Sequence, residues 1–487
     1  MSVTRSILLI IISMALGVFS PKASDFDYSK GILIINEDWY GHHNSSINYL
    51  EPDNPDSEYW HYRIVREENP GKELGCTNQY AVLWNGKLYC IAKQEKDPGA
   101  SILGGRITVC DATTMKILHQ QSLINPSGDQ CDGRAFVGID NHKGYISSSN
   151  GIWIYDLDNY EIKGMIEGTG NPYAGGDNDK PNTDPTGALY YGQTGIMIYS
   201  DGLVFAAHQQ FGLLIIDPNT DSVIEVMSLD IVEPGAGIGS LVKSKDGSLW
   251  ISVAKNTQGL GSALNYIVKL DPVALEYEVK KLPDDIYGPL NSWYAWTPDA
   301  FIASPNENIL YWKGGINTWF SGVWIYKYDI DKDEYSLFIN LEEDPDDWKL
   351  YGCSIGIHPD TDEIYMSLYH QFGKPEYMVR RYSPHGEIVK EYPMIENYWF
   401  PSVMIFPQKE QDAKISSINV DKGKIEVVGK TLKCINYKEE RIDLYSLNGQ
   451  NITTIIPVSD EDEYFLDVCS GIYVIRGPEF SKKVLIK

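Results

Sequence analysis

The sequence has few basic residues for its length. Its 487 residues include 41 lysines and arginines against 67 aspartates and glutamates, which gives a formal net charge of −26 at pH 7. No run of lysine or arginine offsets this charge locally. Because such a field repels a phosphate backbone, we expect no binding to nucleic acid or to an anionic membrane surface.

Cysteine is also scarce. The chain has seven cysteines, with none before Cys76 and none at zinc-finger spacing, so we expect neither a lipoprotein anchor nor a structural zinc site. In an oxidising compartment Cys76 could pair with Cys131, and Cys434 with Cys469. Buried unpaired thiols are the equal alternative.

Long apolar runs are missing after the first residues. The run Ile7–Phe19 follows Arg5 and precedes the small residues Ala23 and Ser24. It is too short to span a membrane and predicts a secretory signal over residues 1–24. We therefore expect an exported protein, in the periplasm, on the outer surface or outside the cell.

Catalytic signatures are absent as well. The chain has no glycine-rich phosphate loop, no nucleophile elbow and no metalloprotease motif. The sequence therefore favours a binding protein over an enzyme. The alternative is a propeller-type lyase or hydrolase that uses His208 or His370 as its base.

The sequence does contain a repeat of four short strands joined by tight polar turns. Asn85-Gly86, Asp201-Gly202 and Asp246-Gly247 mark hairpins, because Asn, Asp and Gly tolerate positive φ. The repeats predict an all-β protein with almost no helix, whose main body is a seven-bladed β-propeller at residues 31–407. Six and eight blades are the alternatives.

Both ends of this repeat region belong to one predicted blade. The chain enters at Gly31 on a second strand, so the missing first strand can come from Pro401–Pro407. The segment Tyr59–Val65 is expected to be a strand of the same blade. Such closure removes the exposed edge of an open array.

A polar linker at residues 408–414 precedes a second unit at residues 415–487. Its short apolar segments predict a small β-sandwich. The motifs IDLYSLNGQ (Ile442–Gln450), SGIYVIR (Ser470–Arg476) and KKVLIK (Lys482–Lys487) resemble the C-terminal sorting domains of proteins exported by the type IX secretion system. The resemblance implies a sorting role.

Aromatic residues gather in one set of predicted loops, those after second strands and between blades. The turns on the other side are short and polar. An apolar patch on one face of a propeller marks a binding site, although some rings could merely pack loop against loop. The candidate ligand-binding residues are Trp39, Tyr40, His42, His43, His208, Phe211, Trp293, Tyr294, Trp296, Trp319, Phe320, Tyr369, His370, Phe372, Tyr398 and Trp399.

The segment Gly175–Pro185 clusters oxygen ligands. Asp177, Asp179 and Asp184 are weak candidates for a Ca²⁺ site, with a solvated acidic loop as the alternative. No other cofactor is indicated.

Residues 31–407 resemble the YncE-like surface propellers of gut bacteria. The resemblance rests on GILIINEDWYGHHNSSINYL from Gly31, on GIWIYDLDNYEI from Gly151 and on LLIIDPNTDSVIEVM from Leu213. Characterised relatives of this family are BtuG-type proteins, which capture corrinoids such as cobalamin and pass them to a TonB-dependent outer-membrane transporter. The resemblance implies a corrinoid or a similar large nutrient as ligand and such a transporter as partner. Carbohydrate binding is the alternative, because tryptophan and tyrosine rings also stack on sugars.

Overall fold

The structure is a computed structural model. It describes residues 26–129, 131–174, 192–257, 260–289, 300–315, 321–407, 416–420, 423–446, 450–468, 471–477 and 481–486. In these ranges helix is confined to α1 (Ile64–Glu68) and the 3-10 segments η1 (Tyr28–Lys30), η2 (Leu229–Ile231) and η3 (Leu341–Glu343). None of these helices has the length and apolar character needed to cross a bilayer. The predicted all-β class is confirmed.

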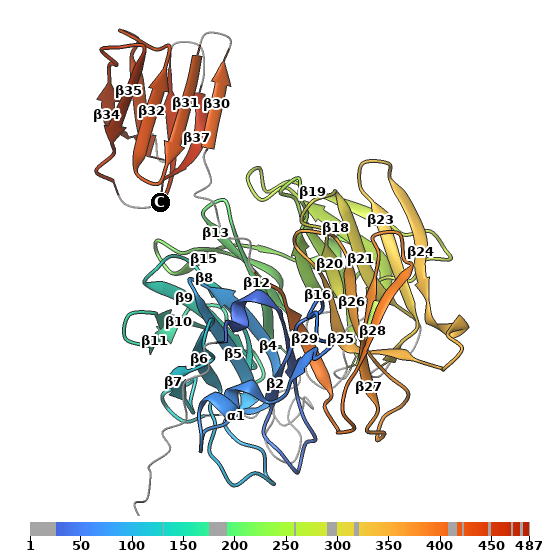
Figure 1. Ribbon diagram of the computed structural model, residues 1–487. Helices are drawn as coiled ribbons and strands as arrows, with labels where there is room; N and C mark the ends of the chain where they lie inside the picture. Colours follow the sequence, from blue (N-terminus) through green and yellow to red (C-terminus); the bar gives the residue numbers. More distant parts are fainter. Residues whose placement is uncertain are drawn as a thin grey trace, which may run out of the picture.

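The described strands form nine antiparallel sheets, and seven of these sheets lie before Pro407 (Figure 1). Most have four strands in chain order from one edge to the other. In chain order the seven sheets comprise β1 (Ile32–Asn36), β2 (Ser46–Leu50) and β3 (Trp60–His61) with β29 (Pro401–Ile405); β4 (Cys76–Trp84), β5 (Lys87–Gln94), β6 (Ile107–Asp111) and β7 (Ile117–Gln121); β8 (Gly133–Gly138), β9 (Lys143–Ser148), β10 (Ile152–Asp156) and β11 (Glu161–Met165); β12 (Thr194–Ser200), β13 (Leu203–His208), β14 (Gly212–Asp217) and β15 (Ser222–Met227); β16 (Ala236–Lys243), β17 (Leu249–Thr257), β18 (Leu260–Leu270) and β19 (Tyr277–Lys281); β20 (Phe301–Ala303), β21 (Ile309–Gly314), β23 (Trp324–Asp329) and β24 (Glu334–Asn340); and β22 (Ser321–Gly322), β25 (Lys349–Ile357), β26 (Ile364–Tyr369), β27 (Tyr377–Tyr382) and β28 (Ile388–Pro393).

The two ends of this region meet in one sheet. Strand β29 pairs with β1, with Leu33 opposite Ile405 and Ile35 opposite Val403, so the predicted closure is confirmed. The first strands of the sheets contact one another in a cycle that runs through β29, β4, β8, β12, β16, β20 and β25 and returns to β29. Figure 1 shows β29, in orange, between β4 and β25. The sheets therefore form a closed, propeller-like ring.

Apolar side chains between neighbouring sheets form the core of the ring. In one such layer Phe205 and Ile215 pack with Ile251 and Val268 from the next sheet. Burying side chains of this size contributes about 1.5–3 kcal/mol each.

The hairpin turns match their sequence signals, since Asn85 has φ 49° and Asp201 has φ 52°. The strands thus place their ends, and the loops that join them, on the two open faces of the ring.

The segment Tyr59–Val65 departs from its predicted strand. Only Trp60 and His61 belong to β3. Arg63 adopts a left-handed conformation with φ 55°, and α1 starts at the next residue. A left-handed residue breaks strand geometry, and the short helix then buries Ile64 and Val65.

Cys76 and Cys131 are free thiols, so the predicted disulfide between them is not formed. Cys76 Sγ lies 3.4 Å from Asp97 Oδ2, whereas Cys131 Sγ lies 3.1 Å from Ser148 Oγ, so the two thiols face different partners. Cys434 is also free and buried, and Cys469 lies outside the described residues.

Two further sheets follow residue 415. They comprise β30 (Ser416–Val420), β31 (Gly423–Val428), β32 (Thr431–Ile435) and β35 (Glu461–Phe465), and β34 (Asn451–Ile455), β33 (Ile442–Ser446), β36 (Gly471–Arg476) and β37 (Ser481–Ile486). Both sheets contribute to one apolar core, in which Ile425 and Leu432 pack with Leu444 and Ile475. Figure 1 draws these strands in red and dark orange.

Candidate functional site

The ring has two chemically different faces. We call the side at which second strands end the loop face, and the side of the tight turns the turn face. The pairings of Asn36 with Ser46 and of Cys76 with Gln94 place these strand ends on the loop face. The longer connections of the ring therefore lie there.

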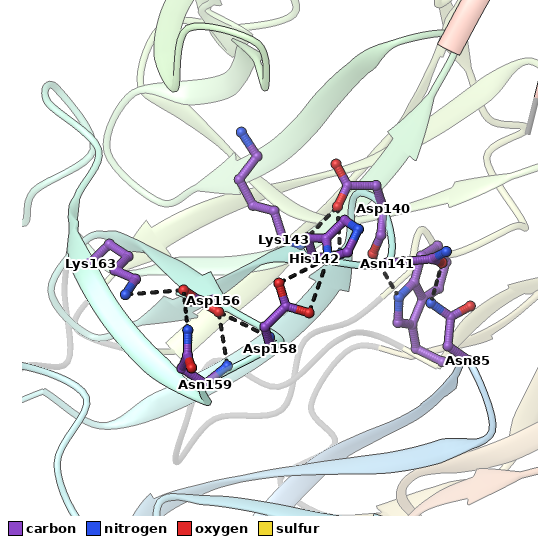
Figure 2. A network of polar contacts seen from close by, with 10 residues as sticks. Asn85, Asp140, Asn141, His142, Lys143, Asp156, Asp158, Asn159 and Lys163 are labelled. Atoms are coloured by element: carbon purple, nitrogen blue, oxygen red, sulfur yellow. Dashed lines mark hydrogen bonds and ion pairs between the residues drawn. The ribbon is translucent and has the colours of Figure 1, made fainter. Parts of the chain in front are cut away.

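The polar groups of the turn face are largely satisfied by their own turns. Figure 2 shows such a network, in which the Asp140 carboxylate accepts hydrogen bonds from the amides of His142 and Lys143. His142 Nδ1 lies 2.9 Å from Asp158 Oδ2, and the hydrogen bond to this carboxylate raises the pKa of the imidazole. Local bonds of this kind stabilise hairpins and leave few groups for a ligand.

An aromatic cluster lies on the loop face where the ring closes. It consists of His42, Trp39, Tyr398, Phe400 and Phe372. The ring centroids of Trp39 and Tyr398 are 3.9 Å apart, and those of Phe372 and Phe400 are 5.4 Å apart. Phe372 is 60% exposed, so the cluster presents rings to solvent. It joins the loop after β1, the loop after β26 and the segment before β29.

Tyr40 adds a further exposed ring beside this cluster, at 57% exposure. The exposed rings are not confined to this face, since Tyr277 is exposed at the turn-face end of β19. It is the linked set of rings that distinguishes the loop face.

Hydrogen bonds from neighbouring segments hold the first aromatic loop. The amides of Glu37 and Asp38 donate to the carbonyl groups of Phe400 and Trp399 at 2.9 and 3.0 Å. The Asp97 carboxylate accepts from the amides of Gly41 and Gly99 at 2.8 and 2.7 Å. The loop is therefore held in place before any ligand arrives, which lowers the entropic cost of binding.

A buried polar group lies behind the same loop. Asn44 Nδ2 donates to Glu73 Oε2 at 2.9 Å, and Arg66 Nε lies 3.0 Å from Glu73 Oε1. Asp38 is buried, with Oδ1 3.9 Å from Arg63, and burial raises the pKa of its carboxyl group to about 7. Partial burial of the imidazole also lowers the pKa of His43.

Three of the predicted binding residues lie in the packed interior. Trp399 is buried, stacks on Tyr62 and donates from Nε1 to the carbonyl of Ile395. Tyr369 is buried, and its hydroxyl oxygen lies 2.9 Å from Ser321 Oγ. These side chains support the face and do not present their rings to a ligand.

The third is His208, at the end of β13. Its ring stacks on Phe211 at 4.1 Å, and its Nδ1 accepts hydrogen bonds from the amides of Gln210 and Phe211. Burial lowers the pKa of its imidazole to about 4. The equivalent His370 stacks on Trp348 at 3.8 Å instead, so the two histidines do not form one site. This arrangement does not favour His208 as a general base, because a base must reach its substrate.

Several predicted site residues fall outside the described ranges. They are Asp177, Asp179, Asp184, Trp293, Tyr294, Trp296, Trp319 and Phe320. Among the residues that are described, no three His, Cys, Asp or Glu side chains come together as metal ligands would.

Charged residues near the loop face, Glu37, Lys93 and Arg134, were not predicted from the sequence. Glu37 follows β1, and its Oε1 accepts from Gln79 Nε2 at 3.1 Å. Surrounding protein atoms raise the pKa of Glu37 to about 7, although the side chain keeps partial contact with solvent. Lys93 is the last residue but one of β5 in the next sheet, and Arg134 is the second residue of β8 in the sheet after it. In a sequence, charged residues near strand ends are typical of solvated positions. Only the arrangement of the sheets in the ring shows that Glu37, Lys93 and Arg134 interact.

Together these features define an all-β protein built as a closed, propeller-like ring of sheets with linked aromatic rings on one face. The chain belongs to the DUF5074 family, a domain of unknown function, whose family model matches residues 30–407. No curated protein matches the chain.

Similar solved structures share little sequence with the chain. The extracellular domain of the putative one component system BT4673 from B. thetaiotaomicron is 11% identical, with a TM-score of 0.44, 94% of this chain covered and 57% of that one. PorZ, a surface component of the type-IX secretion system of Porphyromonas gingivalis, is 10% identical, with a TM-score of 0.44, 91% of this chain covered and 62% of that one. Citrobacter koseri AztD is 10% identical, with a TM-score of 0.41, 92% of this chain covered and 98% of that one. At these TM-scores none of the three bears on function.

Proposed function

We propose that this chain is an exported binding protein that captures a large, flat, partly apolar ligand on the loop face of a seven-bladed β-propeller. The aromatic cluster around Trp39, Tyr398 and Phe372 carries this proposal. Linked rings with exposed faces bind flat ligands by stacking, and each well-packed ring contributes on the order of 1 kcal/mol beyond its area. A ligand broader than one ring would contact several loops at once.

The proposed ligand class is a corrinoid, such as cobalamin. The macrocycle offers an apolar plane with polar edges, which fits rings flanked by His42 and His43. The hydrogen bonds that hold the loop at Gly41 support tight binding, because little order is lost. In this proposal the protein then passes its ligand to a TonB-dependent outer-membrane transporter.

The proposed organisation has four parts. Residues 1–24 are the export signal, residues 31–407 the propeller, residues 408–414 a linker and residues 415–487 a small β-sandwich that resembles a sorting domain. The match of the family model to residues 30–407 and the apolar core shared by the last two sheets support this division.

Co-elution of a coloured ligand tests the proposal. We expect the purified protein to retain cobalamin or cobinamide through gel filtration in a one-to-one ratio. If the folded protein retains neither, the corrinoid assignment fails, and soluble glycans are the next ligands to test. Turnover of a glycan that is lost on replacing His370 would instead indicate a lyase or hydrolase.

A further inference from the structure

The turn face carries a group of apolar side chains at the axis of the ring. The first strands of the seven sheets end on this face, and their cycle of contacts places these ends around the axis. Six of the seven sheets have a half-buried apolar or aromatic residue at or next to this end, and the other sheet has the small Ala303. The six residues, which we call the axial group together with Ala303, are Trp84, Ile139, Tyr199, Val242, Ile357 and Phe406.

Two rings of the axial group are held against neighbouring sheets. The Trp84 indole lies over Gly138, where any side chain would collide with the ring, and its Nε1 donates to the carbonyl of Asp140 at 3.3 Å. The Phe406 ring lies over Gly356 in the same way. Both rings are therefore fixed in position and still partly accessible to a partner.

The other members of the axial group also pack from sheet to sheet. Ile139 and Tyr199 belong to one apolar cluster, although they come from two neighbouring sheets. Val242 and Ala303 share another cluster across the next pair of sheets. The axial group therefore extends around the ring.

Acidic residues surround the axial group. The six turns that join first to second strands, at residues 85–86, 139–142, 201–202, 244–248, 304–308 and 358–363, contain seven carboxylates and one lysine, Lys245. Figure 2 shows one of these carboxylates, Asp140, in the turn that contacts Asn85. Three of the seven carboxylates form ion pairs with cations outside the turns, which are Asp201 with Lys243, Asp246 with Lys269 and Glu363 with Arg381. The carboxylates therefore outnumber these four cations by three.

We propose that the axial group is the docking site for a basic segment of a partner protein, one that presents a large apolar side chain between lysines or arginines. An apolar centre with a charged rim is the usual composition of a protein interface. The acidic rim favours a basic partner, because complementary charge steers association. A second copy of this chain would bring the same acidic rim to the contact, so like charges disfavour it. This inference goes beyond the proposed function, since it concerns the opposite face.

Fluorescence anisotropy tests the docking site on the full chain. The probe is a labelled synthetic peptide in which one tryptophan stands between two pairs of lysines. We expect saturable one-to-one binding that weakens at least about fivefold between about 50 and 300 mM sodium chloride, because salt screens the charged rim. A peptide with serine in place of tryptophan should bind at least about tenfold more weakly. If the tryptophan peptide does not saturate, or if the serine peptide binds equally well, the proposal is overturned.

Variants then locate the site. Ala303→Arg places a cation in the axial group and should weaken peptide binding at least about tenfold, and Phe406→Ala should weaken it about threefold or more. Leu337 is an exposed apolar residue on the outer strand β24, and Leu337→Ala is the matched control that should change nothing. Circular dichroism shows whether each variant folds, and Ile357→Ala replaces Phe406→Ala if the latter does not. Wild-type affinity in the folded Ala303→Arg protein overturns the proposal.

The docking site and the proposed function fail separately. If the peptide binds as expected and neither corrinoid does, the docking site stands and the corrinoid class is wrong. If a corrinoid binds and the peptide does not, the docking site is wrong and the binding face stands. Displacement of the peptide by cobalamin would place both on the loop face, and this result also overturns the docking site.

Discussion

The amide of Gly41 donates a 2.8 Å hydrogen bond to Asp97, a residue of the neighbouring sheet's loop. Asp97 is completely buried and also accepts from Gly99. A side chain at Gly99 would approach the carbonyl oxygen of Gly41 to 2.2 Å, so the two loops fit closely only with glycine there. The loop of the second sheet thus fixes the aromatic loop of the first.

Replacing this carboxylate should loosen the loop. Asp97→Ala leaves the amides of Gly41 and Gly99 without this carboxylate acceptor, and we expect the free energy of unfolding to fall by about 1.5–3 kcal/mol. Ligand affinity should fall as well, because the loop is no longer held. Urea unfolding and calorimetry measure the two effects. Asp97→Asn keeps one acceptor oxygen and should lose less stability and less affinity than Asp97→Ala. Equal losses in both variants would contradict the role of Asp97 in holding the loop.

Trp399 should behave as a core residue. Trp399→Ala removes a buried ring that packs on Tyr62 and lies under Arg63, at 5.0 Å from the guanidinium carbon. We expect a loss of about 3–5 kcal/mol of stability. Phe372→Ala, on an exposed ring, should cost little stability and weaken binding. Thermal unfolding distinguishes the two, and a stable Trp399→Ala protein would place this ring on the surface after all.

The regular part of the fold could be predicted from the sequence. Alternating apolar strands and turns such as Asn85-Gly86 specify hairpins locally, and the unpaired strand at Gly31 specified the partner Pro401–Pro407. Tyr59–Val65 could not be predicted in the same way, because its apolar residues suit a strand and a short helix equally. The left-handed turn at Arg63 decides between them.

The site could be predicted only in part. Aromatic residues in the loops predicted a binding face, but composition does not tell an exposed ring such as Phe372 from a buried one such as Trp399. The charged residues near the loop face were missed for a different reason. Lys93 and Arg134 lie on β5 and β8 of two different sheets, and only the packing of these sheets against each other brings the two strands together.

Glu37 should make stability depend on pH. Its pKa is raised from 4.5 to about 7 in the folded protein. Between these values the folded state binds the extra proton, so the free energy of unfolding falls as pH rises through this window and is level above it. Glu37→Gln has no carboxyl group at this position, so its free energy of unfolding lacks this dependence on pH. We expect the wild type to lose about 1–3 kcal/mol relative to the variant between pH 5 and pH 8, and urea unfolding at both values measures it. Parallel pH profiles would contradict the raised pKa.

Limited proteolysis tests the division of the chain. The predicted linker at residues 408–414 should be cut first, which releases a stable fragment that ends there. A chain ending at Pro407 should also fold, because it keeps β29, whereas one ending at Phe400 loses the strand that closes the ring and should aggregate. First cleavage between residues 85 and 400 would contradict this division.

Calorimetric titration of cobalamin and cobinamide into matched variants tests the central claim most directly. The pair Trp39→Ala and Phe372→Ala removes two rings of the aromatic cluster, and the pair Asn141→Ala and Asn219→Ala changes two exposed turn-face residues. Hot-spot truncations cost about 2 kcal/mol or more, and about 1.4 kcal/mol is tenfold in affinity. We predict that the first pair binds at least about tenfold more weakly than wild type, with its fold intact, and that the second pair binds like wild type. Loss of binding in the turn-face pair alone would contradict the claim that the loop face binds the ligand.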